Sequence, residues 1–304
     1  MIVLLILLIL VLLLFALSYV LFYLGAVRNS IGPKPSKSPT YAPYIDQFKA
    51  GAEWFRSQDP QRVSIRSRDG LKLVGYFLPA EGEARGTLLL AHGYRSSLWT
   101  DFAIVYRYYH EMGWNILTIH QRSHGESEGK YITFGIKERF DVCDWATYLA
   151  DRFGPSHTVV LDGISMGAGT VLMALGTELP ENVKGAIADC GYTCPYDLYV
   201  HVLSSHHIPC RLLLAIAQLH AWAFAGFGFR EYSAITALKQ NHRPVLFIHG
   251  EADPLVPIRF TMENYAACAG SKQLATVPGA GHAMSYLLQP ERCRAALEGF
   301  LSQF

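Results

Sequence analysis

Three residues far apart in the sequence have the chemical types that together make a hydroxyl group reactive: Ser165, Asp253 and His282. A serine hydroxyl is a poor nucleophile near neutral pH, so it needs a base that takes its proton and a third group that holds the base. A histidine can be that base, and an aspartate can fix its tautomer and offset the imidazolium charge. The types and the order Ser, Asp, His therefore indicate nucleophilic attack on an acyl carbon.

The surroundings of Ser165 favour this chemistry. Ser165 lies between Gly163 and Gly167, where a run of β-branched and apolar residues gives way to the helix-like VLMAL. This is the pattern G-x-S-x-G, in which a sharp strand-to-helix turn lifts the serine oxygen out of the sheet and glycines tolerate the crowding. The following helix would aim its first N–H groups at charge forming beside the serine. The simpler alternative is a tight turn in which the serine only caps the helix.

The acid and the base each have an alternative. Asp189 also ends an expected strand, and Glu251 stands close to Asp253. We favour Asp253, because its Asp-Pro turn leaves the side chain pointing out of the strand end. An isolated histidine in a Gly-rich loop, such as His282, is often only solvated, and it gains weight here from its place in the order.

A tetrahedral intermediate also needs N–H donors for its oxyanion. One is expected from Met166, the residue after the nucleophile candidate. We expect the other from the backbone N–H of Tyr94 in the turn AHGYRSS, where Gly93 allows a close approach. Losing one such donor typically costs about 2.7–4 kcal/mol of barrier. A strand-His-Gly turn with no part in catalysis is the alternative.

The elements that must position these residues alternate between strands and helices. A hairpin, RVSIRS and LKLVGYFL joined at RDG, precedes six short apolar runs: TLLLAH, NILTIH, TVVLDG, GAIADC, PVLFIHG and KQLATV. Helical segments lie between them, and apolar runs without strict alternation suit strands covered on both faces. The pattern predicts an α/β fold with a mostly parallel eight-stranded sheet and helices on both faces. Each candidate residue then follows the carboxyl end of a strand, where ligands bind in such sheets.

The alternation fails over residues 191–243, a long stretch rich in His, Leu, Ala and Phe. An insertion of this length is expected to be functional, and we interpret it as a helical cap over the site. Its alternative is an ordinary extra pair of packing helices. Because the stretch is strongly apolar, a cap built from it would favour a small-molecule substrate with an apolar acyl or aryl group.

The chain divides into an apolar anchor at 1–25, a Pro- and Ser-rich linker at 26–45 and a domain at 46–304. The first segment has no charged side chain and reaches roughly 35 Å as a helix, enough to cross a hydrocarbon core of about 30 Å. Tyr19 and Tyr23 lie near its end, as is typical of a membrane interface. A cleaved signal peptide is the competing interpretation, but the basic leading region is missing and the apolar run is too long for one.

Charge and cysteine usage bear on partners and compartment. Basic residues follow the apolar segment at Arg28, Lys34 and Lys37, which favours a cytoplasmic domain on a single-pass anchor. Six irregularly spaced cysteines do not resemble a disulfide framework, in agreement with a reducing compartment. A formal net charge of +1 and the absence of a basic stripe argue against nucleic acid as a partner.

Two further clusters were weighed as metal or redox sites. Cys190 and Cys194 are separated by three residues rather than the two of redox motifs, so we expect them to be plainly buried. His201, His206, His207 and Cys210 allow a zinc site, but no carboxylate accompanies them and we expect them to line the cap. We therefore expect no metal and no cofactor.

Taken together, the stretches LLLAHGYRSS, HQRSHGESEGKYITFG, GISMGAG, PVLFIHGEADPLVP and GAGHAMSY carry a family resemblance over residues 63–304. The chain resembles serine hydrolases of the α/β-hydrolase fold, in particular the N-terminally membrane-anchored bacterial type. It is similar to the serine aminopeptidase and monoacylglycerol lipase-like branch and to animal membrane-linked depalmitoylating hydrolases. Gln121 departs from the pattern, because many relatives carry Asp there; it stands in a supporting loop, outside the triad.

This resemblance implies that Ser165, Asp253 and His282 form a catalytic triad and that Tyr94 and Met166 supply the oxyanion N–H groups. The expected activity is that of a serine hydrolase cleaving a carboxylic ester, a thioester or a small amide through an acyl-enzyme. A peptidase acting on short peptides uses the same parts and stays open. A non-catalytic membrane-bound scaffold on a hydrolase fold is the alternative from another class.

Overall fold

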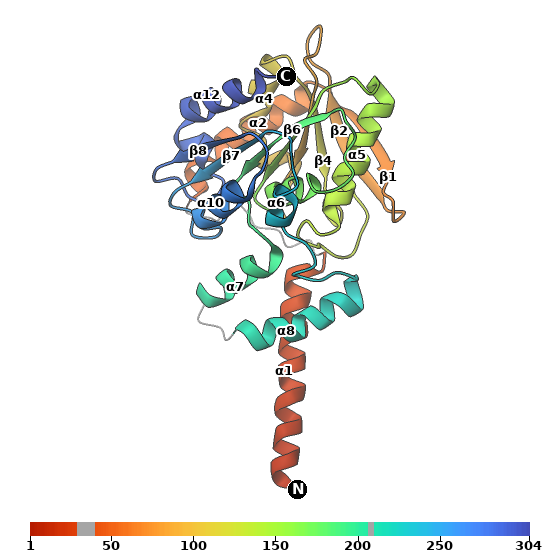
Figure 1. Cartoon of the computed structure of the whole chain (residues 1–304), viewed down its shortest axis with the longest axis vertical. Coiled ribbons are helices and arrows are strands. Elements are labelled where there is room, and N and C mark those ends of the chain that lie inside the picture. The colour runs from red at the N-terminus through yellow and green to blue at the C-terminus, as the bar shows by residue number, and fades with distance from the viewer. Residues whose placement is uncertain (29–39, 206–209) are drawn as a thin grey trace.

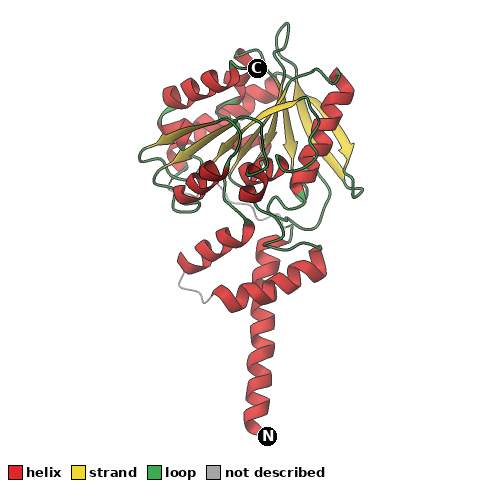
Figure 2. Cartoon of the chain, viewed as in Figure 1, coloured by secondary structure: helices red, strands yellow, loops and turns green. Residues whose placement is uncertain are grey.

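The computed structural model describes residues 1–28, 40–205 and 210–304. Its main domain is built on one sheet with the strand order β1-β2-β4-β3-β5-β6-β7-β8 (Figures 1 and 2). The β1–β2 and β2–β4 pairs are antiparallel and the other pairs are parallel, which confirms the predicted mostly parallel eight-stranded sheet. The strands are β1 (Gln61–Arg66), β2 (Lys72–Leu78), β3 (Thr87–Ala91), β4 (Asn115–His120), β5 (Val159–Ile164), β6 (Val183–Asp189), β7 (Val245–Gly250) and β8 (Lys272–Val277).

Helices cover both faces of the sheet (Figure 2). Successive side chains of a strand point to opposite faces, so Leu88 and Leu90 of β3 enter one core while Leu89 and Ala91 enter the other. The first core is closed by α2 (Ile45–Ser57), α4 (Tyr106–Glu111) and α12 (Pro290–Leu301), and the second by α5 (Glu138–Phe153), α6 (Met166–Ala174) and α10 (Ile258–Ala267). Shorter helical turns are η2 (Ala42–Tyr44), α3 (Leu98–Asp101), α9 (Ala234–Leu238) and α11 (Ser285–Leu288).

The expected insertion at 191–243 contains the helices α7 (Pro195–Ser205), α8 (Cys210–His220) and η3 (Ala221–Ala225). These helices stand apart from the sheet, below the main domain and beside the C-terminal part of α1 (Figure 1). The last helix of the insertion, α9, instead packs on α6 and α10 of the main domain. The part that stands apart is therefore shorter than the predicted insertion.

The N-terminal helix α1 (Ile2–Ala26) is the one helix in the described part of the chain that is long and apolar enough to cross a membrane. It projects away from the main domain, and most of its side chains are exposed (Figure 1). Beyond it, Val27 pairs with Tyr131 as an isolated bridge. The linker expected at 26–45 falls mostly on residues 29–39, outside the described residues, and α2 begins at Ile45.

Candidate active site

Ser165 stands between the end of β5 and the start of α6. Its backbone has φ 57° and ψ −113°, a conformation that residues other than glycine rarely adopt. The backbone N–H of Ser165 donates to the carbonyl of Asp189 at 2.8 Å, and the Ser165 carbonyl accepts from Gly169 at 3.0 Å as the helix begins. These bonds tie the strained residue to β6 on one side and to α6 on the other.

The two glycines of the motif are required by close packing. A Cβ added to Gly163 would lie 2.3 Å from the backbone of Gly167, and a Cβ added to Gly167 would lie 1.8 Å from the carbonyl oxygen of Ala91. Real Cβ atoms do not come this close to backbone atoms, so both positions exclude any larger residue. The turn is therefore pressed against the end of β3, which brings Ser165 beside the β3 turn.

The structure brings together the three candidate residues from the ends of different strands. The Nε2 atom of His282 lies 2.9 Å from Ser165 Oγ, and its Nδ1 atom lies 2.7 Å from Asp253 Oδ2. Asp253 follows β7, and His282 follows β8. The phenol of Tyr41 donates to the His282 carbonyl at 2.6 Å, which fixes the loop that carries the imidazole.

The carboxylate of Asp253 is fully buried and bonded at both oxygens. Its Oδ1 accepts the backbone N–H groups of Leu255 and Val256, each at 2.9 Å, and Oδ2 faces His282. The His249 ring lies 3.5 Å from Oδ2. Burial acts to raise the pKa of Asp253, but the hydrogen bonds from the two histidines outweigh it and hold the pKa well below its usual range. The group is thus an anion at neutral pH and bonds the Nδ1–H tautomer of His282.

The competing acid, Asp189, lies at the end of β6 and is buried. Among the described residues its carboxylate oxygens make no hydrogen bond of standard geometry, and burial, with the nearby carboxylates, raises its pKa well above the usual value. The carboxylate that meets His282 is that of Asp253. The other acid weighed from the sequence, Glu251, is exposed.

The thiol of Cys190, expected from the sequence only to be buried, also lies here. Cys190 directly follows β6, has a φ of 49°, and its Sγ lies with an oxygen of Asp253 and a nitrogen of His282 within 4.8 Å of one another. Burial, with the nearby carboxylates, raises the pKa of this thiol well above its ordinary value. It is therefore protonated and a weak nucleophile. Its place after a parallel strand was the signal that could have put it at this edge.

Three atoms of that group have the chemistry of a metal site, but two are already committed to the Ser-His-Asp hydrogen bonds. Cys194 is buried as expected. Of the histidine cluster weighed for zinc, His206 and His207 lie outside the described residues, and His201 contacts the carbonyl of Pro254 at 3.0 Å.

The turn after β3 lies against the serine. A Cβ added to Gly93 would be 3.4 Å from Ser165 Cβ. Within the described residues, the backbone N–H groups of Tyr94 and Met166 donate to no backbone acceptor. The Gly93 N–H donates to Asp101 Oδ2 at 2.6 Å, which holds the turn in place. Both N–H groups are thus without a hydrogen-bond acceptor among the described residues.

Comparison with known proteins shows the fold to which this geometry belongs. Residues 86–231 match the family described as alpha/beta hydrolase fold. The chain has the α/β-hydrolase fold. An esterase from Pyrococcus furiosus superposes with a TM-score of 0.66 at 22% identity, covering 82% of this chain and 93% of the esterase. At that identity the likeness concerns the fold alone.

Proteins similar to this chain in sequence occur in Bacillus subtilis and Schizosaccharomyces pombe. The uncharacterized protein YqkD of Bacillus subtilis is 28% identical over 82% of this chain and 81% of its own length. Protein bem46 of Schizosaccharomyces pombe is 27% identical over 70% of this chain and 67% of its own length. An acylaminoacyl peptidase from Pyrococcus horikoshii superposes with a TM-score of 0.60 at 17% identity, covering 81% of this chain and 41% of that protein.

In this α/β-hydrolase fold, the loop after β4 supports the turn that carries Tyr94. The Nε2 atom of His124 accepts the backbone N–H of Arg95 at 3.0 Å, while its Nδ1 donates to the Arg122 carbonyl at 2.9 Å. Burial, with repulsion from the neighbouring His92, lowers the pKa of His124 to about 3. The ring is neutral, as an acceptor at Nε2 must be. The sequence alone showed only that the loop supports the site.

Gln121, the departure from the family pattern, is part of the same support. Its side-chain N–H group donates to the carbonyl of His92, and its Oε1 accepts from the Thr170 hydroxyl at 3.2 Å. The amide therefore links the end of β3 to α6. A carboxylate at this position could accept from Thr170 but could not donate to the carbonyl.

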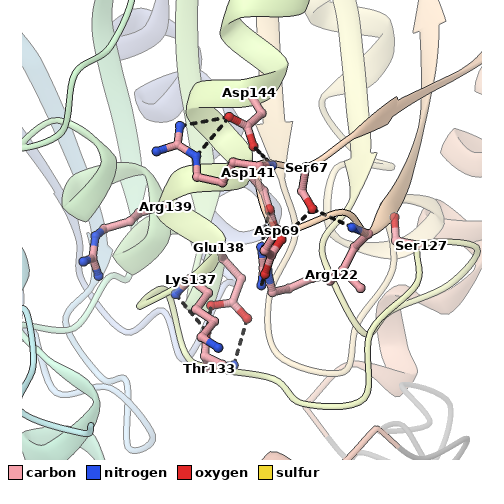
Figure 3. Close-up of polar contacts among 12 residues, drawn as sticks. Ser67, Asp69, Arg122, Ser127, Thr133, Lys137, Glu138, Arg139, Asp141 and Asp144 are labelled. Atoms are coloured by element: carbon pink, nitrogen blue, oxygen red, sulfur yellow. Dashed lines mark hydrogen bonds and ion pairs between the residues drawn. The ribbon is translucent and has the colours of Figure 1, made fainter. Parts of the chain in front are cut away.

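In the same loop, the buried Arg122 forms ion pairs with two other segments of the chain (Figure 3). The guanidinium of Arg122 donates to both oxygens of Asp141 at 2.7 and 2.6 Å and to Asp69 at 2.8 Å. Nearby, the carboxylate of Glu138 accepts the backbone N–H of Thr133 at 2.8 Å (Figure 3). It also accepts the backbone N–H of Gly135 at 2.8 Å. A buried charge must be paired and hydrogen-bonded, and these ion pairs and hydrogen bonds meet that requirement. Their effect on the site is indirect, because they fix the loop that supports it.

Proposed function

We propose that the protein is a membrane-anchored serine hydrolase that cleaves a carboxylic ester, a thioester or a small amide through an acyl-enzyme. The observation that carries the proposal is the continuous hydrogen-bonded chain from Ser165 Oγ through the His282 ring to Asp253, with 2.9 and 2.7 Å between the heavy atoms. It lies on a strained strand-to-helix turn, which is where such a nucleophile is exposed. The buried thiol of Cys190 is not a competing nucleophile.

In the proposed reaction, Ser165 Oγ attacks the acyl carbon while His282 Nε2 takes its proton. The carbonyl oxygen becomes an oxyanion, and the N–H groups of Tyr94 and Met166 are assigned to it. His282 then gives its proton to the leaving group as the tetrahedral intermediate collapses to the acyl-enzyme. A water molecule activated by the same histidine releases the acid and restores Ser165.

We further propose that α1 stays on the mature protein as its membrane anchor. Contacts to the last turn of α1 favour this over a cleaved signal peptide. The Tyr94 phenol donates to the Gly25 carbonyl at 2.7 Å, and the Arg95 guanidinium donates to the carbonyls of Leu24 and Val27. Cleavage would remove these partners from the turn beside the nucleophile. The basic residues after α1 favour a cytoplasmic domain.

The test is covalent labelling of the full-length chain in membranes with a fluorophosphonate probe. Labelling of the wild type and its loss in Ser165→Ala are expected, with hydrolysis of a short p-nitrophenyl ester falling by roughly 10⁶-fold. A Ser285→Ala variant is the matched control, because Ser285 is buried and lies outside the triad. A folded wild type that takes no label would favour a non-catalytic scaffold.

A substrate series then ranks the bond that is cleaved. We expect p-nitrophenyl esters of longer acyl chains to be hydrolysed faster than short ones, because the cap is apolar. Aminoacyl anilides are the comparison that represents short peptides. Faster turnover of the anilides than of every ester would move the assignment to a peptidase.

A further inference from the structure

The helix formed by α8 and η3 turns an apolar face away from the protein. Leu212, Leu219 and Trp222 are 61%, 54% and 73% exposed, and Ala215 between them is exposed as well. Their spacing places them on one helical face. A helix facing water normally carries polar or charged side chains there, but Arg211 is the one charged residue from 211 to 225.

The opposite side of α8 is held by α1. The hydroxyl of Ser18 in α1 donates to the carbonyl of Leu213 at 3.1 Å, so this buried hydroxyl is satisfied within the protein. The His220 ring lies edge-on to Phe15, with 5.8 Å between ring centroids. Figure 1 shows α8 crossing α1 at a steep angle, between the main domain and the projecting part of α1. If α1 crosses a membrane, α8 lies close to the plane of that membrane.

The exposed apolar surface of α1 continues past the level of α8. Leu17 and Val20, at that level, are 51% and 47% exposed, and Leu24, nearer to the main domain, is 55% exposed. Tyr23 marks the expected interface. At about 1.5 Å per residue, the contact of Ser18 with α8 lies about 7.5 Å deeper along α1 than Tyr23. The α8 level is therefore within the apolar stretch, at the depth of interfacial helices, which lie about 5–10 Å into the boundary of headgroups and acyl chains.

We propose that α8 and η3 lie in the lipid leaflet next to the main domain, with Leu212, Leu219 and Trp222 among its acyl chains. The proposal rests on the membrane anchoring by α1 proposed above and adds a second element that contacts the bilayer. The occupant of the apolar face is thus lipid rather than a second protein. Continuity with the lipid-facing surface of α1 and the absence of charge between 212 and 225 carry this choice.

The test reconstitutes the full-length chain in phosphatidylcholine vesicles and measures the depth of Trp222. The emission that Trp222 contributes is the difference between the wild type and Trp222→Phe, which keeps an apolar ring. We expect this difference spectrum to be blue-shifted, to lose intensity with nitroxides attached to the upper acyl chain, and to be insensitive to iodide in the water. Trp54→Phe is the matched control, because Trp54 contacts His110 of α4 in the main domain, and its emission should not respond to the lipid quenchers.

The outcomes separate this proposal from the anchoring by α1. Resistance of the protein to alkaline extraction, measured on the same vesicles, reports whether α1 is inserted. If α1 is inserted and iodide quenches Trp222 while the lipid nitroxides do not, the leaflet position of α8 is wrong and the anchor stands. Quenching by neither reagent, with crosslinking between copies, would show that a second chain covers this face and would also overturn it. Extraction of the protein by alkali would contradict the anchoring by α1, and with it this proposal.

Discussion

The sheet edge that carries Ser165 and the contact between α1 and the cap differ in how they are held. At the edge, the side chains of Asp253 and His282 are 0% and 16% exposed, and each is hydrogen-bonded on both sides. At the α1–cap contact, aromatic and aliphatic side chains dominate, with single hydrogen bonds such as that from Ser18. Directional bonds fix distances to tenths of an ångström, whereas apolar contacts fix mainly which surfaces stay together. The difference suggests that one region determines the chemistry and the other determines where it takes place.

The largest effect should come from removing a hydrogen-bonding group at the sheet edge that carries Ser165. Asp253→Asn is expected to lower kcat on a short p-nitrophenyl ester by about 10⁴-fold, because the amide can no longer accept the Nδ1–H proton as an anion and holds the wrong tautomer. Steady-state kinetics of the full-length chain measure this.

Asp189→Asn is the matched control at the neighbouring strand. Burial raises the pKa of Asp189 well above its usual value, which favours the protonated acid that the amide imitates, and we expect little change in kcat. An equal loss in both variants would show that Asp189 shares the role of the acid, contrary to the geometry.

The meeting of the three candidate side chains at one sheet edge was largely predictable from the sequence. Strand-end positions and the order Ser165, Asp253, His282 placed three side chains at one edge, because parallel strands bring their carboxyl ends together. The sequence did not decide which carboxylate meets His282, since Asp189 and Asp253 both follow strands; in the structure it is that of Asp253. The close contact of Gly167 with the carbonyl of Ala91 gives the physical reason for the second glycine of the G-x-S-x-G pattern.

The rest depends on contacts between distant segments that carry no local pattern. Nothing in the sequence pairs His124 with the Arg95 N–H, since the bond depends on how two loops fold over one another. The docking of the α1 end on the Tyr94 turn is equally non-local. The cap was expected as one insertion over 191–243, but α9 has the apolar contacts of a main-domain helix and only the segment before it stands apart.

An intermediate effect, on stability, is expected when the pH is lowered, because two buried histidines lie at the end of β4 and in the loop after it. The pKa of His124 is lowered to about 3 and that of His120 to about 4, chiefly by burial, so both are neutral when folded. The unfolded chain takes up their protons below about pH 6.5. The free energy of unfolding is therefore complete above pH 6.5 and falls as the pH drops from 6.5 toward 3, by up to about 1.4 kcal/mol per pH unit for each histidine.

Denaturant unfolding of the detergent-solubilised chain between pH 7 and pH 5 measures this slope. His124→Gln should reduce the slope by about the share of one histidine, and the exposed His242→Gln should leave it unchanged. An unchanged slope in His124→Gln would mean that this ring already takes up its proton in the folded state. Such a result would weaken the contrast between the hydrogen-bonded sheet edge and the apolar contact between α1 and the cap.

The smallest effect is expected where the two regions meet. Arg95→Ala removes the guanidinium from the carbonyls of Leu24 and Val27 but keeps the backbone N–H that His124 accepts. A cation at a helix C-terminus contributes about 0.3–1 kcal/mol, so the last turn of α1 should open about two- to fivefold more often.

Hydrogen exchange of residues 23–27 in lipid nanodiscs reports this opening, and Arg107→Ala on the distant α4 is the control. Because the network from Asp253 to Ser165 does not include the guanidinium, kcat on a short ester should stay within about twofold, the equivalent of roughly 0.4 kcal/mol. A loss of kcat as large as that of Asp253→Asn would mean that the end of α1 takes part in holding the turn beside Ser165. The two regions would then be one functional unit, and the position of the anchor in the membrane would itself determine the rate.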